Sequence, residues 1–101
     1  MQSIKTPIGL IIRITEHSWD IISTIKHPIM KSHFQDVVSA LVNPDEIRRS
    51  KSDLNVYLFY KIIGNSRWVC AVTKDAMSKE GFLITAYLTD KIKEGDVIWT
   101  K

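Results

Sequence analysis

Residues 55–74, NVYLFYKIIGNSRWVCAVTK, contain two apolar runs separated by the polar segment IGNS. Both runs are rich in β-branched and aromatic residues, a composition typical of β-strands, and a glycine-containing break is typical of a hairpin turn. We therefore predict an antiparallel hairpin with a two-residue turn at Gly64 and Asn65. In that register one sheet face carries Tyr57, Phe59, Lys61, Trp68, Cys70, Val72 and Lys74, and a slip by one residue would change this set.

The strand pattern continues on both sides of the hairpin, with EIRRS before it and GFLITAYLT and DVIWT after it. The charged segment DKIKEG between the last two strands reads as a turn. Alternation along GFLITAYLT predicts a core face with Phe82, Ile84, Ala86 and Leu88. The opposite, hydroxyl-bearing face would carry Leu83, Thr85, Tyr87 and Thr89.

The first 45 residues predict a short strand or extended arm followed by two helices. IGLIIRIT reads as the strand or arm, and Thr15 as the N-cap of the first helix. Apolar residues at helical spacing are Trp19, Ile22 and Ile25 in the first helix and Met30, Phe34, Val37, Val38 and Leu41 in the second. Pro28 should end the first helix at or before His27, and Asn43–Pro44 the second.

Length and element order predict one α+β domain spanning residues 1–101. We expect two N-terminal helices packed on one face of a four- to five-stranded antiparallel sheet, with the other face left for a ligand. The apolar runs are far shorter than the ~20 residues of a membrane span, so we expect no membrane association and a cytoplasmic location. The single cysteine, Cys70, excludes an internal disulfide and reads as core.

His27 is the sharpest candidate for chemistry. It precedes Pro28 in KHPIMK, so a joint between helices would hold its imidazole, which titrates where general acid and base catalysis is easiest. The alternative is a helix C-terminal histidine favoured by the helix dipole. His17 and His33 have weaker claims. Neither HExxH nor CxxC spacing occurs, so we expect no metal site, and we expect no cofactor.

Cationic and aromatic residues alternate along the strands: Arg48, Arg49, Lys51, Lys61, Arg67 and Lys74 among Tyr57, Tyr60, Trp68 and Tyr87. Cations bind phosphates and rings stack on unpaired bases, so the pattern favours RNA binding. The net charge of +3 also favours polyanionic partners. A solvated charged face is the alternative interpretation.

Three stretches, HP, NPDEIRRS and ITAYLT, occur in an order and spacing that resembles the phage-associated branch of the Barnase, EndoU, colicin and RelE-like (BECR) nucleases, over about residues 11–99. The resemblance implies metal-independent RNA cleavage by a toxin or effector. It also implies His27 as general acid or base, Arg48 and Arg49 as phosphate ligands, and a cleft lined by Thr85, Tyr87 and Thr89.

The predicted function is therefore an endoribonuclease in which the RNA 2′-hydroxyl attacks the adjacent phosphate, with His27, Arg48, Thr85 and Tyr87 as catalytic residues. The predicted RNA-binding residues are Arg49, Tyr57, Tyr60, Lys61, Lys74 and Thr89. Lys61, Lys74 and Tyr60 remain open as the second proton-transfer or phosphate group. RNA is the expected partner, with an antitoxin or immunity protein as a further one. The alternative is a non-catalytic RNA-binding or protein-interaction module on the same scaffold.

Overall fold

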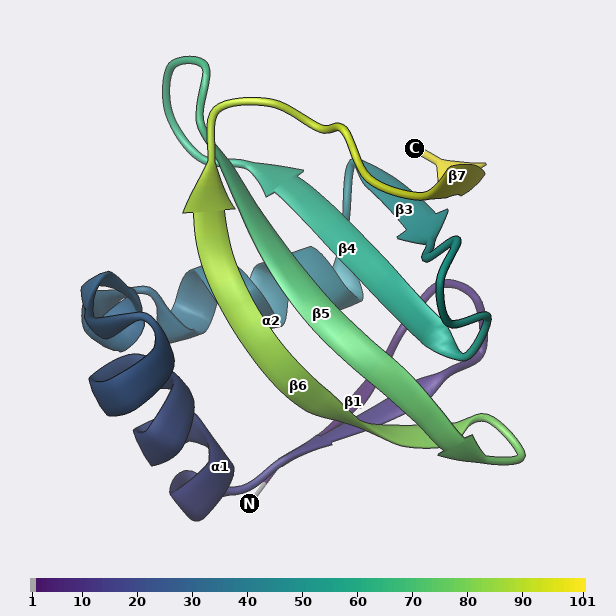
Figure 1. Ribbon diagram of the computed structural model, residues 1–101, viewed down its shortest axis with the longest axis horizontal. Coiled ribbons are helices and arrows are strands. Elements are labelled where there is room, and N and C mark those ends of the chain that lie inside the picture. The colour runs from purple at the N-terminus through teal and green to yellow at the C-terminus, as the bar shows by residue number, and fades with distance from the viewer. Residues whose placement is uncertain (1) are drawn as a thin grey trace.

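Seven strands form one mixed sheet in the computed structural model, which describes residues 2–101 (Figure 1). The strands are β1 (Gln2–Lys5), β2 (Ile11–Ile14), β3 (Glu46–Arg49), β4 (Val56–Ile62), β5 (Trp68–Met77), β6 (Glu80–Thr89) and β7 (Asp96–Thr100). Their order across the sheet is β1-β2-β6-β5-β4-β3-β7. Neighbours are antiparallel except β2 and β6, which are parallel.

The predicted α+β class is confirmed, but the predicted layout was wrong. Two strands, β1 and β2, precede the helices, and the sheet is larger than expected and mixed. β2 was expected as a strand or arm. The sequence of β1, QSIK, has a single buried side chain, Ile4, and so carries no strand-like alternation that could have revealed it.

The helices are α1 (Glu16–Ile21), η1 (Ile22–Lys26, a π-helix), η2 (Pro28–Ser32, a 3-10 helix) and α2 (Phe34–Val42). The N-cap at Thr15 is confirmed, because its hydroxyl accepts a hydrogen bond from the Ser18 amide at 3.0 Å. The π-helical turn is closed by a hydrogen bond of 2.8 Å that the His27 amide donates to the Ile22 carbonyl oxygen. This turn changes the helical phase, and Ile25, expected on the apolar stripe, is 76% exposed.

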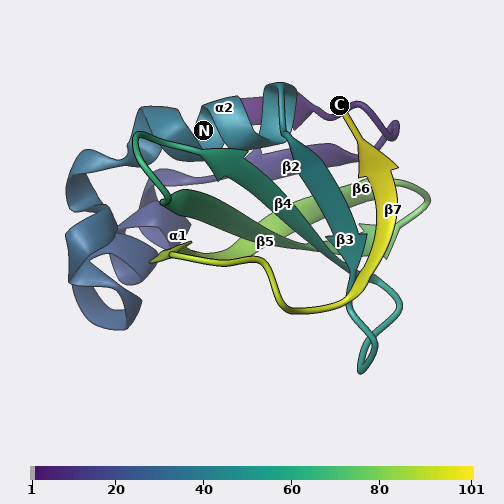
Figure 2. The same cartoon turned by 90° about the horizontal axis from the view of Figure 1, so that it is seen from above.

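The main core lies between α2 and one face of the sheet (Figure 2). Val37, Ala40 and Leu41 of α2 are fully buried and belong to one cluster with Ile47, Phe59, Val69 and Ala71 of the strands. We call the sheet face that is turned away from α2 the open face. None of the helices in residues 2–101 has the length and apolar character that crossing a membrane requires.

The β4–β5 hairpin forms as predicted, but its register differs by one residue. Ile63 donates its amide hydrogen to the Arg67 carbonyl at 2.8 Å, so three residues, not two, form the loop. Cys70 consequently pairs with Tyr60 and Val72 with Leu58. The predicted face was therefore wrong: the open face carries Leu58, Tyr60, Trp68, Cys70, Val72 and Lys74, whereas Tyr57, Phe59 and Lys61 point to the helix side.

A β-bulge changes the predicted alternation of β6. Val72 pairs with Thr85 but Thr73 pairs with Leu83, which leaves Ile84 as the extra residue. Thr85, Tyr87 and Thr89 lie on the open face as expected. On the other side of the bulge the faces are exchanged, so Leu83 is buried in the core and Phe82 turns to the open face.

Residues 90–95, which we call the strap, connect β6 to β7 at the edge of the sheet (Figures 1 and 2). Ile92 of the strap packs against the cluster formed by Leu58, Tyr60 and Cys70. The strap therefore covers part of the open face and forms one border of the candidate site.

Candidate functional site

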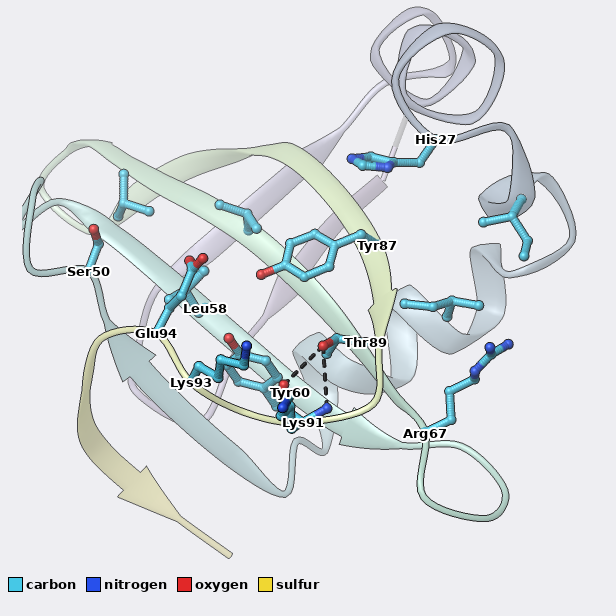
Figure 3. Close-up of a pocket in the computed structure, with 14 residues that line it drawn as sticks. His27, Ser50, Leu58, Tyr60, Arg67, Tyr87, Thr89, Lys91, Lys93 and Glu94 are labelled. Carbon is cyan, nitrogen blue, oxygen red and sulfur yellow. Dashed lines mark hydrogen bonds between the residues drawn. The ribbon is translucent and has the colours of Figure 1, made fainter.

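A pocket of about 740 Å³ lies on the open face, between the helical corner at His27 and the strap (Figure 3). Strands β4, β5 and β6 supply its floor: Val56, Leu58, Tyr60, Val72, Tyr87, Leu88 and Thr89. Its rim consists of His27, Ile29, Ser50, Arg67, Lys91, Lys93 and Glu94. The floor is thus mainly apolar and aromatic, and the rim carries the charges.

His27 occupies the joint between η1 and η2. Its amide bonds to Ile22, and its carbonyl oxygen accepts a hydrogen bond from the Met30 amide at 2.9 Å. The adjacent Lys26 fastens this corner to the sheet, because its Nζ donates to the carbonyl oxygen of the bulge residue Ile84 at 3.0 Å. The imidazole is partly buried and lies over β6, with its ring centre 5.9 Å from that of Tyr87.

Three protonatable side chains form a row across the floor, paired through Cys70: Tyr60 on β4 and Cys70 on β5, which are buried, and Tyr87 on β6, which is partly buried. Burial raises the pKa of both phenols far above their ordinary range and raises the pKa of the Cys70 thiol to about 12. All three groups therefore stay protonated near neutral pH. The phenols can donate hydrogen bonds to a ligand but cannot act as bases.

The charged rim combines three cations, Arg67, Lys91 and Lys93, with one carboxylate, Glu94. Glu94 lines the pocket, and its negative charge makes a contribution, smaller than that of burial, to the raised pKa of Tyr60 and Cys70. In Figure 3 His27 and Glu94 lie on opposite sides of the Tyr87 ring. The ion pairs formed within residues 2–101 involve none of these four charged rim groups.

Of the predicted catalytic residues, His27 and Tyr87 are brought together, and Arg48 and Thr85 are not part of the pocket lining. Arg48 pairs with Glu46 through its Nε and donates from Nη1 to the Gly95 carbonyl at 3.4 Å. It therefore tethers the end of the strap. The Thr85 hydroxyl is buried, and no hydrogen-bond partner is found for it in residues 2–101.

The predicted RNA-binding residues divide between the two sheet faces. Tyr60 and Thr89 line the pocket. Lys74 also lies on the open face, outside the pocket lining, and its Nζ pairs with Asp53 at 3.0 Å.

Arg49, Tyr57 and Lys61 lie on the helix side of the sheet, away from the pocket. The Arg49 guanidinium stacks over the Tyr57 ring at 5.5 Å. The Lys61 Nζ donates to the Asn43 carbonyl, at the end of α2, at 3.0 Å. The one-residue difference in hairpin register explains why Tyr57 and Lys61 lie on the helix side, because it exchanges the two faces of β4.

Sequence reasoning missed the strap as part of the site. The segment DKIKEG reads as a charged turn, and nothing in its local pattern indicates that Lys91, Lys93 and Glu94 border a pocket. Its length gives no signal either, because six residues are ordinary for a turn between neighbouring strands, and only the strand order shows that the strap passes β5, β4 and β3. Arg67 was recognised only as one member of a dispersed basic set.

No group of three or more His, Cys, Asp or Glu side chains in residues 2–101 is arranged to hold a metal ion. Comparison of the chain with family models, curated proteins and solved structures finds no match.

Proposed function

We propose that the protein is an endoribonuclease that cleaves RNA through attack of a 2′-hydroxyl on the adjacent phosphate. The observation that carries the proposal is the convergence of an imidazole, a carboxylate and three cations on one pocket. Cleavage of this kind needs a proton acceptor, a proton donor and positive charge near the phosphate. Side chains supply each of these, so the reaction needs no metal ion.

In the proposed mechanism the Glu94 carboxylate accepts the proton of the 2′-hydroxyl as its oxygen bonds to phosphorus. Protonated His27 donates a proton to the 5′-oxygen as the bond between phosphorus and that oxygen breaks. The products are a 2′,3′-cyclic phosphate and a free 5′-hydroxyl. The positions of His27 and Glu94 on opposite sides of Tyr87 support this pairing, because the attacking and leaving oxygens lie on opposite sides of the phosphorus.

Arg67, Lys91 and Lys93 would stabilise the negative charge that develops on the phosphoryl oxygens. The Tyr87 phenol, kept protonated by burial, which raises its pKa, would donate a hydrogen bond to one of these oxygens. The apolar floor around Leu58 and Val72 suits the flat face of a nucleobase. Arg48, predicted as a phosphate ligand, would not contact the phosphate. Its hydrogen bond to the Gly95 carbonyl would instead help to hold the strap in place.

The test is cleavage of an end-labelled RNA in EDTA, with mass spectrometry of the product ends. We expect 2′,3′-cyclic phosphate ends, no cleavage of the 2′-O-methyl oligonucleotide, and a rate loss on the order of 10²–10⁴ in His27→Ala and Glu94→Gln. His17→Ala and Glu16→Gln are matched controls, because both residues are exposed on α1 and neither lines the pocket. Undiminished cleavage by His27→Ala would exclude the mechanism.

We further propose, from the resemblance to toxin and effector nucleases, that the activity is directed at cellular RNA and is held in check by an antitoxin or immunity protein. Expression in a bacterial host tests this. Growth arrest by the wild-type chain and normal growth with His27→Ala at equal protein levels are expected. Equal growth in both cases would argue against a toxin.

One observation favours a second candidate, a non-catalytic RNA-binding module. Arg48 is held by Glu46 and is thereby removed from the set of predicted phosphate ligands. Such a module would bind RNA with a strong salt dependence and release it uncut. The cleavage assay distinguishes the two candidates directly.

A further inference from the structure

Outside the pocket, a second part of the open face combines an aromatic ring with cations. Phe82 on β6 pairs with Arg13 on β2 and with Lys74 on β5, so a ring lies between two basic residues across three adjacent strands. Phe82 is 45% exposed, a large apolar surface to leave in water. Phe82 does not belong to either buried cluster.

All three side chains of this row point to the open face. The residues next to Arg13, namely Ile12 and Ile14, are buried on the helix side, as are Leu83 beside Phe82 and Thr73 beside Lys74. Strand alternation then turns Arg13, Phe82 and Lys74 the other way. The bulge at Ile84 is responsible, since without it Phe82 would share the core face with Ala86.

The row is continuous with the pocket. Lys74 pairs with Val56 of β4, and Val56 lines the pocket. Phe82 and Val56 are thus two strands apart, about 10 Å at the usual strand spacing. A single-stranded nucleic acid that leaves the pocket across β5 would meet the Phe82 ring.

A hollow of about 280 Å³ lies beside Phe82, and Arg13, Met77, Glu80 and Gly81 contribute to its lining. Arg13 forms no ion pair within residues 2–101, whereas Lys74 shares its charge with Asp53. The carboxylate of Glu80 lies in the same hollow and opposes an anion. Arg13 is therefore the cation that is free to meet a phosphate.

We propose that Phe82 and Arg13, supported by Lys74, form a second nucleotide subsite, which binds an unpaired stretch of the same RNA whose scissile part occupies the pocket. Phe82 stacks on a base, and Arg13 contacts an adjacent phosphate. A duplex does not present the faces of its bases, so the subsite selects single-stranded RNA. This inference rests on the proposed function for the identity of the ligand.

The experiment uses 2′-O-methyl oligonucleotides, which lack the attacking hydroxyl and so report binding alone. A fluorescent single-stranded dodecamer, its duplex and a dinucleotide are titrated with wild type, Phe82→Ala, Phe82→Trp, Arg13→Ala and Val97→Ala. Phe82→Ala should weaken dodecamer binding roughly fivefold to tenfold and leave dinucleotide binding unchanged. Phe82→Trp should retain affinity, because it keeps a stacking ring.

Arg13→Ala should lower the slope of log affinity against log salt concentration by about one unit, as expected for one lost phosphate contact. Val97→Ala removes an exposed apolar side chain on β7, which lines neither the pocket nor the hollow, and it should have no effect. Equal dodecamer affinity of wild type and Phe82→Ala, or a duplex bound as tightly as the single strand, would overturn the subsite alone. Failure of the wild type to bind any oligonucleotide would overturn the proposed function as well.

Discussion

The His27 ring centre lies 5.9 Å from the ring centre of Tyr87, with the two planes inclined by 49°. One residue belongs to the joint between η1 and η2, and the other to the middle of β6. Their contact brings an imidazole over a floor whose own protonatable groups, Tyr60, Cys70 and Tyr87, have raised pKa values and are neutral near neutral pH. The pocket therefore has its imidazole and its charged side chains on the rim and hydrogen-bond donors on the floor.

Replacement of Lys26 by Met should loosen the corner that carries His27, because it removes the bond from Nζ to the Ile84 carbonyl. A single exposed hydrogen bond contributes about 1 kcal/mol, so the fold should be retained and the melting temperature should fall by only about 4–8 °C. The cleavage rate should fall several-fold, mainly in kcat. Lys26→Arg, which can restore the bond, is the matched variant, and equal rates in both variants would show that the tether does not position His27.

Tyr87→Phe should slow cleavage by roughly tenfold to a hundredfold, since it removes one hydrogen-bond donor and keeps the ring against His27. Burial raises the pKa of Tyr87 well above its ordinary value, so its titration cannot produce either limb of a neutral pH–rate profile. The pH–rate profile of the variant should therefore rise and fall at the same pH values as that of the wild type, with a lower rate throughout. A displaced alkaline limb would show that Tyr87 itself exchanges the catalytic proton.

Stability should decrease in alkaline solution because of Cys70. Burial raises the pKa of its thiol from 9.0 to about 12. The folded protein thus retains a proton that the unfolded chain loses, so the contribution to stability is complete below about pH 9 and is lost as pH rises through 12. The raised pKa values of Tyr60 and Tyr87 act in the same direction.

Urea unfolding measured at increasing pH tests this linkage. The free energy of unfolding should decrease by at most about 1.4 kcal/mol per pH unit for each such group. Cys70→Ala should give a shallower decrease than wild type above pH 9. Identical pH dependence of the two proteins would mean that Cys70 titrates at its ordinary pKa in the fold.

Gly81→Ala should destabilise the protein by about 1–3 kcal/mol or more, because the added methyl group would lie directly against the Lys74 carbonyl oxygen and force β5 and β6 apart. Gly64→Ala is a suitable comparison. Gly64 has a φ of +75°, which other residues rarely adopt, but no neighbouring atom lies within 4 Å of the added carbon. Its substitution should cost only about 1 kcal/mol of backbone strain.

Urea unfolding of wild type and both variants measures the loss of stability that each substitution causes. The dependence of the free energy of unfolding on urea concentration is compared among the three proteins. The larger loss is expected for Gly81→Ala. Equal losses in both variants would show that the two strands separate more easily than their close approach indicates.

Local patterns predicted several elements correctly. Thr15 caps the first helix, His27 follows its end, and the apolar runs on both sides of IGNS are strands. These features depend on interactions between residues close in sequence, namely capping, the missing amide of proline and side-chain alternation. The incorrect predictions have causes that local patterns do not reveal. Ile25 is exposed because of a π turn, and Tyr57 and Lys61 are on the unexpected face because of one extra loop residue.

The chain's own pattern of residues was sufficient for the α+β class, for the strands from β3 to β7 and for a histidine at a helical corner. The strand pairing, the bulge at Ile84 and the path of the strap were decided only in three dimensions, and they determine which side chains share the pocket. The physical reason is the two-residue period of a strand, since a shift of one residue reverses every side chain. Residues as distant in sequence as His27 and Glu94 line one pocket only when the whole sheet has formed.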